Sequence, residues 1–335
     1  MLILIFMLIN LDIGGYVDNR PFVGFSDSIL FSGSARGWID VKTTQDIYGA
    51  HTALDIMIPY DTVMNIQRNE IEISRLAAWI GPYNLRAALG RQLINWGTSR
   101  VFKCLDFFNR INYFEPGYER KGVDAMQATW SFSQRSSARV LCKPLLTFDE
   151  SLFAGRLATS IFHNDIGLNA FYQKEPELIA GGIDLAGELI VGYWAEAAHW
   201  QNDTAEYHKS SFGIDYTLPW SIYVMAEYFH DISGQFDPAQ YDFDLIYNGL
   251  RSTLARDYLY LSAGIMPNMY LRPAFNAIIN LNDQGTTLMP NIFYALFDNV
   301  DLNIGANILI GDDISEFRNI NPYNVIIYSW LKIYL

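Results

Sequence analysis

Charged side chains recur along alternating polar and apolar segments of this chain. Because side chains on a strand point to alternate faces, each segment carries its charges on one face. Four successive segments place one carboxylate each on the polar face: Asp184, Glu196, Asp215 and Glu227. Earlier segments place bases on that face: Arg86, Arg139, Lys143 and Arg156. Opposed charges across water order polar solutes, so the pattern predicts the wall of an aqueous pore. The alternative is a set of cross-strand ion pairs that close the lumen.

One long segment, residues 98–121, combines cations with aromatic rings. Its cations include Arg100, Lys103 and Arg110. Its rings include Phe102, Phe107, Phe108, Tyr113 and Phe114. Burial of each ring is worth roughly 1.5–3 kcal/mol, so we expect the segment to fold into the pore with its rings against the wall.

If residues 98–121 fold inward, their cations lie at the narrowest section of the pore. We expect one side of the constriction to be formed by Arg86, Arg100, Lys103 and Arg110, with the carboxylates Asp184, Glu196, Asp215 and Glu227 across from them. The alternative for the loop's base is that Arg120 and Lys121 pair with Glu119 or Asp124.

Patterns typical of enzymes are absent from the sequence. The five histidines show no pair at metal-ligand spacing, so no metal site is predicted. No nucleophile elbow and no phosphate-binding glycine loop occur. Four carboxylates on four adjacent segments differ from the two-residue acid and base pair of a glycosidase. The sequence therefore predicts neither an enzyme nor a bound cofactor.

The elements that position these residues are strands of period two. In the run from Phe212 to Leu218, Phe212, Ile214, Tyr216 and Leu218 share an apolar face, with Asp215 on the other. Eighteen such segments begin near Asn10, Ser28, Tyr48, Glu70, Leu85, Gly122, Ala138, Leu152, Ile166, Leu178, Gly192, Tyr207, Ser221, Arg256, Leu271, Thr287, Asp301 and Pro322. Short and long connections alternate, as in outer-membrane barrels. We predict an all-β fold, a single antiparallel transmembrane β-barrel of about 18 strands with an inward-folded loop; 16 strands are the alternative.

Composition agrees with a membrane barrel. Charged residues make up only 18% of the chain, while Tyr and Phe number 21 each. No run of eighteen apolar residues occurs, so no membrane-spanning helix is predicted. Residues 1–9 are interpreted as a signal-peptide remnant or a disordered start, and residues 10–335 as the barrel. The net charge of −13 argues against a nucleic-acid partner. Cys104 and Cys142 are expected to be unbridged.

Two strands leave the direction of a side chain open. Arg91 falls on the lipid side of its strand unless Gly90 forms a bulge that reverses the register, and otherwise it snorkels at the membrane interface. Arg75 and Trp79 share a face whose direction the pattern does not determine.

About forty residues resemble a family of Gram-negative outer-membrane, porin-like β-barrels. The matching pieces are Gly90-Arg91-Gln92, Trp96-Gly97, Asp106-x-Phe108-Asn109 and Glu119-Arg120-x-Gly122-Val123-Asp124-Ala125. The resemblance implies a protein of the bacterial outer membrane, surrounded by the lipid bilayer, through which small polar or charged solutes diffuse passively. Porins are often trimers, so it also implies a homo-oligomer. The alternatives are an export or uptake barrel specific for a polysaccharide or hydrophobic compound, with lumen aromatics such as Tyr258, Tyr260, Phe293 and Phe297, and a structural barrel with a plugged lumen.

Overall fold

The computed structural model describes residues 10–59, 70–108, 120–202, 205–248 and 250–335. Eighteen strands form one antiparallel sheet. The first nine strands are β1 (Leu11–Phe25), β2 (Ile29–Thr44), β3 (Tyr48–Pro59), β4 (Glu70–Ile80), β5 (Leu85–Gln92), β6 (Val123–Ser131), β7 (Ser136–Lys143), β8 (Leu152–Ile161) and β9 (Asn164–Gln173). The other nine are β10 (Leu178–Glu188), β11 (Gly192–Asn202), β12 (Glu206–Leu218), β13 (Ile222–Asp231), β14 (Asp257–Ile265), β15 (Leu271–Asn280), β16 (Thr286–Phe297), β17 (Val300–Ile310) and β18 (Val325–Tyr334).

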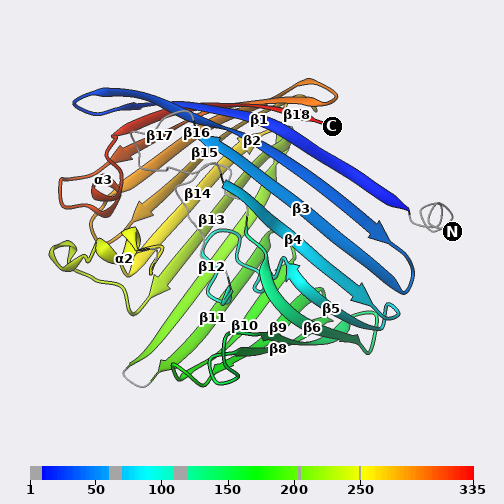
Figure 1. Cartoon of the computed structure of the whole chain (residues 1–335). Coiled ribbons are helices and arrows are strands. Elements are labelled where there is room, and N and C mark those ends of the chain that lie inside the picture. Colours follow the sequence, from blue (N-terminus) through cyan, green and yellow to red (C-terminus); the bar gives the residue numbers. More distant parts are fainter. Residues whose placement is uncertain (1–9, 60–69, 109–119, 203–204, 249) are drawn as a thin grey trace.

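The sheet closes on itself as a barrel (Figure 1). Each strand pairs with the next, and β1 pairs with β18 from Tyr16 opposite Tyr334 to Phe25 opposite Val325. Among the described strands, closure leaves no unpaired sheet edge, which is what a lipid bilayer requires of a barrel, because backbone groups find no water there. The predicted barrel of 18 strands is confirmed, and each predicted strand start lies within three residues of the observed one.

The odd-numbered strands all end at one rim of the barrel, which we call the long-loop rim. The longest connections leave from it: 93–122 after β5, 232–256 after β13 and 311–324 after β17. The opposite rim, which we call the short-turn rim, carries the tight connections. The first strand begins there and the last strand ends there, as the alternation of short and long connections in the sequence predicts. The helical pieces are brief: η1 (Pro219–Ser221), η2 (Pro238–Gln240), α2 (Asp244–Tyr247) and α3 (Glu316–Ile320). In the parts of the chain that the structure describes, no helix is long and apolar enough to cross a membrane.

The apolar side chains of the strands point outward. On β12, Phe212, Ile214, Tyr216 and Leu218 are 53%, 43%, 40% and 39% exposed, while the side chain of Asp215 is 15% exposed and faces the lumen. This is the opposite of a soluble sandwich, in which the apolar face would be buried. The prediction for this strand is confirmed.

The pairing of β4 and β5 with their neighbours shows the direction of Arg91 and Arg75, which the sequence pattern left open. Arg91 lies on the exterior at the long-loop end of β5, where it forms two hydrogen bonds of 2.9 and 2.7 Å with Asp124 on β6. The pairing of β5 runs without a shift through Gly90 on both sides, so no bulge reverses the register. Arg75 is buried and faces the lumen, because an irregularity opposite Ala53 and Leu54 adds Ser74 to β4.

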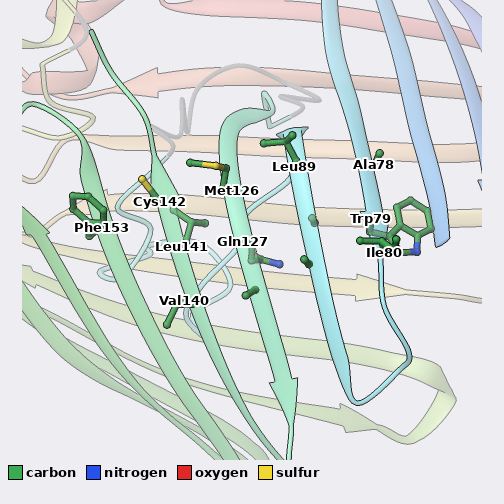
Figure 2. A pocket seen from close by; sticks show the side chains of 13 residues that line it. Ala78, Trp79, Ile80, Leu89, Met126, Gln127, Val140, Leu141, Cys142 and Phe153 are labelled. Atoms are coloured by element: carbon green, nitrogen blue, oxygen red, sulfur yellow. The ribbon is translucent and has the colours of Figure 1, made fainter. Parts of the chain in front are cut away.

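The exterior is not smooth. An apolar depression of about 650 Å³ lies across β4 to β8. Its outer rim is formed by large side chains that are each at least 46% exposed: Ile80, Leu89, Met126 and Val140 (Figure 2). Small residues, including Ala78, Ala87 and Ala128, form its floor. Cys142 lies in this region and Cys104 inside the barrel, and both are free thiols, as predicted.

Candidate functional site

The connection after β5 folds into the barrel and crosses to the wall made by β10 to β14. Residues 98–105 of this connection, which we call the docking segment, contact that wall through backbone N–H groups and through side chains. Thr98 Oγ1 donates to the carbonyl of Leu185 at 3.2 Å. Gly97 has a φ of +91°, and a Cβ there would lie 2.2 Å from Glu196 Oε1, so only glycine lets the chain approach this closely. The inward-folded loop is confirmed.

Glu196 on β11 accepts three hydrogen bonds from the docking segment. The backbone N–H groups of Ser99, Cys104 and Leu105 donate to its carboxylate at 2.6, 2.8 and 3.3 Å. The side chain is 2% exposed. An irregular segment has no ladder partners for its N–H groups, so a buried carboxylate supplies the acceptors.

Glu227 on β13 does the same for the other half of the segment. The N–H groups of Arg100, Val101 and Phe102 donate to it at 2.8, 3.1 and 2.6 Å. The indole Nε1 of Trp194 donates to it at 2.7 Å. Glu227 has no exposed surface.

These contacts correct the expected constriction. Glu196 and Glu227 do not face the cations of the loop across water, because the loop itself covers them. Asp184 is also removed from the water: it is 1% exposed, accepts from Arg156 at 2.6 and 2.8 Å, and accepts from Asn169 Nδ2 at 2.8 Å. The expected acidic wall is used to dock the loop and to pair one arginine.

Asp215 remains near the lumen water. It accepts from Arg100 at 3.2 Å and from the hydroxyl of Tyr223 at 2.8 Å. Arg100 is 56% exposed, and its guanidinium lies 4.8 Å from the centre of the Trp194 ring. Arg100 of the loop and Asp215 of the wall therefore do pair, but in direct contact and not facing each other across water as expected.

The aromatic rings of the loop pack against the wall, as expected. Phe102 stacks on Phe229 with centroids 5.0 Å apart and also contacts Tyr258. Phe107 packs on Phe171 and Trp200 at 5.1 and 4.8 Å. These contacts bury the rings in two apolar clusters inside the barrel.

The remaining cations of the loop meet partners near its base. Lys103 Nζ donates to Asn95 Oδ1 at 2.8 Å, and burial together with the charge of Arg120 lowers the pKa of this ammonium group. Arg120 pairs with Asp106 at 3.1 Å and Lys121 with Glu72 at 2.8 Å, while Asp124 pairs with Arg91. Arg110 and Glu119 lie outside the described residues.

Three of the predicted basic residues lie in one cross-strand row. Arg86 on β5 is opposite Thr129, which is opposite Arg139 on β7, which in turn is opposite Arg156 on β8. All three arginines face the lumen, since outward positions such as Val140 and Leu157 alternate with them. Lys143 lies on the same face of β7 at its long-loop end. Within the described residues, only Arg156 of these four forms an ion pair.

Sequence reasoning missed a second group of lumen cations. Arg36 pairs with Asp55 across β2 and β3, and Arg20 with Asp18 on β1. Several lumen cations lie over aromatic rings. Arg36 lies over Trp38 of its own strand, and four others lie over rings of the neighbouring strand: Arg20 over Trp330, Arg86 over Trp79, Arg272 over Phe293 and Lys332 over Tyr16. A cation next to an aromatic residue two positions away, as in Arg36 and Trp38, was the signal for them.

The four aromatic residues suggested as a lumen ladder do not form one. Tyr258 is fully buried between Phe102 and Phe317, and Phe297 is 71% exposed next to the turn after β16. The hydroxyl of Tyr260 donates to Asn276 Oδ1 at 2.9 Å, and the guanidinium of Arg272 lies over the ring of Phe293. An apolar path for hydrophobic solutes is therefore not assembled from these residues.

A buried glutamate holds the connection after β17 over the barrel. Glu316, the first residue of α3, accepts from the backbone of Leu254 and from Asn280 Nδ2, both at 2.9 Å, and from the Tyr258 hydroxyl. Burial raises the pKa of Glu316 to about 7 from 4.5. The carboxyl is therefore largely protonated in the folded protein below that pH.

This shift predicts that α3 is held more weakly at alkaline pH. A carboxyl whose pKa is raised by folding contributes its full stability below pH 4.5, and that contribution is lost as the pH rises through about 7. After correction for the intrinsic rate, hydrogen exchange of the α3 amides should be faster at about pH 8 than at about pH 5. Glu316→Gln should remove the difference. Equal protection of the wild type at both pH values would contradict the prediction.

No group of three or more His, Cys, Asp or Glu side chains is placed to hold a metal ion in the described ranges.

No family model matches the sequence, and no curated protein matches it. Solved structures do match. OprD of Pseudomonas aeruginosa has a TM-score of 0.65 at 8% identity, covering 97% of this chain and 95% of that one. A BenF-like porin from Pseudomonas fluorescens Pf-5 has a TM-score of 0.65 at 10% identity, covering 97% and 98%. The fold is a porin fold.

A third structure of this porin fold, OccK2 (OpdF) of Pseudomonas aeruginosa in complex with glucuronate, gives a TM-score of 0.64 at 6% identity, covering 97% of each chain. At these identities the likeness shows the barrel architecture and its strand number. The family resemblance of residues 90–125 stays a prediction.

Proposed function

We propose that the protein is a channel of a Gram-negative outer membrane through which small solutes diffuse passively, with a preference for solutes that carry a carboxylate. The observation that carries the proposal is the row of Arg86, Arg139 and Arg156 on the lumen wall. Asp184 neutralises Arg156, but in the described residues Arg86 and Arg139 form no ion pair, and Glu196 and Glu227 are occupied by the docking segment.

The mechanism needs no cofactor. An anion in the lumen loses part of its hydration, and guanidinium groups replace it with planar pairs of N–H donors. In this row the guanidinium of Arg86 lies over the ring of Trp79, which contacts it without neutralising its charge. The inserted loop limits the size of the solute.

Glucuronate, which the OccK2 structure contains, is a sugar carboxylate. It is a reasonable first probe, because its carboxylate suits the arginine row and its hydroxyls suit the lumen amides, such as Asn276. We also propose that the protein forms a homo-oligomer within the lipid bilayer.

The test is conductance in planar bilayers. We expect discrete current steps, a reversal potential in a salt gradient that shows anion preference, and a reduction of the current when glucuronate is added. The absence of steps would favour a structural barrel with a plugged lumen. Steps with cation preference would support a channel and overturn the proposed solute class.

A further inference from the structure

Three of the five histidines lie on the exterior of three adjacent strands: His199 on β11, His208 on β12 and His230 on β13. Their outward direction follows from alternation. On β11 the buried residues Trp194, Glu196 and Ala198 point inward, and on β12 the exposed Phe212 shares the face of His208. All three are near the long-loop rim, where β11 ends and β12 begins.

His199 and His208 form a direct cross-strand pair. They are opposite each other in the register of β11 and β12, their ring centroids are 4.5 Å apart, and their Nδ1 atoms are 3.2 Å apart. Two imidazole nitrogens bound to one tetrahedral Zn²⁺ at 2.0–2.1 Å would be separated by about 3.3 Å. The two nitrogens are therefore already at the spacing of a chelating pair.

The exterior becomes polar at this position. On β12 the outward residues change from Phe212 through Ser210 to His208 and the exposed Glu206. On β13 the hydroxyl of Tyr228 binds Asp257 at the same rim, and the same carboxylate holds His230 at 2.8 Å. Tyrosines with a bonded hydroxyl mark the boundary between lipid and water in membrane barrels. The histidine pair lies on the aqueous side of that boundary.

We propose that His199 and His208 bind one transition-metal dication of the Zn²⁺, Ni²⁺ or Cu²⁺ class at the outer rim of the barrel. Each ring ligates through Nδ1 as a neutral imidazole. The proton that lies between the two Nδ1 atoms moves, by exchange with solvent, to Nε2 of the ring that donated it, and water completes the coordination. Imidazole ligands favour these ions over Mg²⁺ and Ca²⁺. Glu206, two residues from His208 on the same face, is a nearby carboxylate that can orient a bound water. The proposal does not depend on the channel function.

Binding is tested on the full chain in detergent micelles, with Zn²⁺ as the probe in isothermal titration calorimetry and Mg²⁺ as the comparison ion. The variants are His199→Ala and His208→Ala. The matched control is His163→Asn, because His163 lies in the turn before β9 with a φ of +65°, which asparagine also adopts. Heat-dependent migration in gels checks that each variant has folded.

We expect the wild type and His163→Asn to bind Zn²⁺ equally and Mg²⁺ not at all. Each variant of the pair should bind Zn²⁺ at least about 100-fold more weakly, because the second ligand no longer binds intramolecularly. Cu²⁺ added to the wild type should give an electron paramagnetic resonance spectrum with coupling to two nitrogens, and this coupling should be lost in His208→Ala. Zn²⁺ binding that is unchanged in both variants, or no Zn²⁺ binding by the wild type, would overturn the proposal.

Discussion

Replacing Glu227 by alanine is expected to release the inserted loop and to raise single-channel conductance several-fold. Glu227 accepts three backbone N–H groups of the docking segment and the indole N–H of Trp194, with no exposed surface of its own. A hydrogen bond to a charged group contributes about 1.5–3 kcal/mol, and removal of the acceptor leaves these donors unsatisfied in a buried place. Undocking returns them to water and opens the lumen.

The measurement is conductance of the purified protein in planar bilayers, with current noise as a second readout of loop motion. The conductance of Glu227→Gln should be intermediate between those of the wild type and Glu227→Ala. The amide oxygen of glutamine still accepts hydrogen bonds, but its NH₂ group faces N–H donors and cannot accept from them. Glu188→Ala is the matched control, since Glu188 is an exposed glutamate at the end of β10. Conductance of Glu227→Ala equal to that of Glu188→Ala would show that the segment stays docked without this carboxylate.

The behaviour of Glu227 also shows where sequence reasoning stopped. Alternation is local, so it correctly placed the polar face of β11 to β13 toward the lumen and gave the number of strands. What covers that face is not local: Ser99 and Glu196 are 97 positions apart in the chain. The pattern records side chains alone, whereas the loop is held mainly through its backbone N–H groups, which carry no sequence signal. The carboxylates were therefore found, and their role was not.

The arginine row was predicted in part for a related reason. Arg86, Arg139 and Arg156 were each assigned to the lumen, because each lies on the polar face of its strand. Their adjacency depends on register, which the turns between β6 and β7 and between β7 and β8 determine. The pairing of Arg156 with Asp184 spans β8 to β10 and depends on the same register. A model of facing charged walls could not have anticipated that an acid and a base would be neighbours.

Reversing the charge at the middle of this row should change the ion preference of the channel. In Arg139→Glu, the new carboxylate stands opposite Arg156 on β8 and Thr129 on β6, with Arg86 two strands away on β5. It removes one cation, adds one anion, and competes with Asp184 for Arg156. A unit charge at 4 Å changes the energy of a passing ion by about 1 kcal/mol even in water, which is about fivefold in permeability. The ratio of anion to cation permeability should fall by at least about that factor.

Reversal potentials in a potassium chloride gradient measure this ratio directly. Arg135→Glu is the control. It makes the same charge change as Arg139→Glu, but Arg135 lies in the exposed turn before β7, outside the barrel wall. At about 0.1 M salt its field is screened within about 10 Å, so its effect on the lumen should be small. If Arg139→Glu and Arg135→Glu gave the same reversal potential as the wild type, the arginine row would not be on the path of the ions. The proposed preference for carboxylates would then lose its structural basis, while the porin fold would stand.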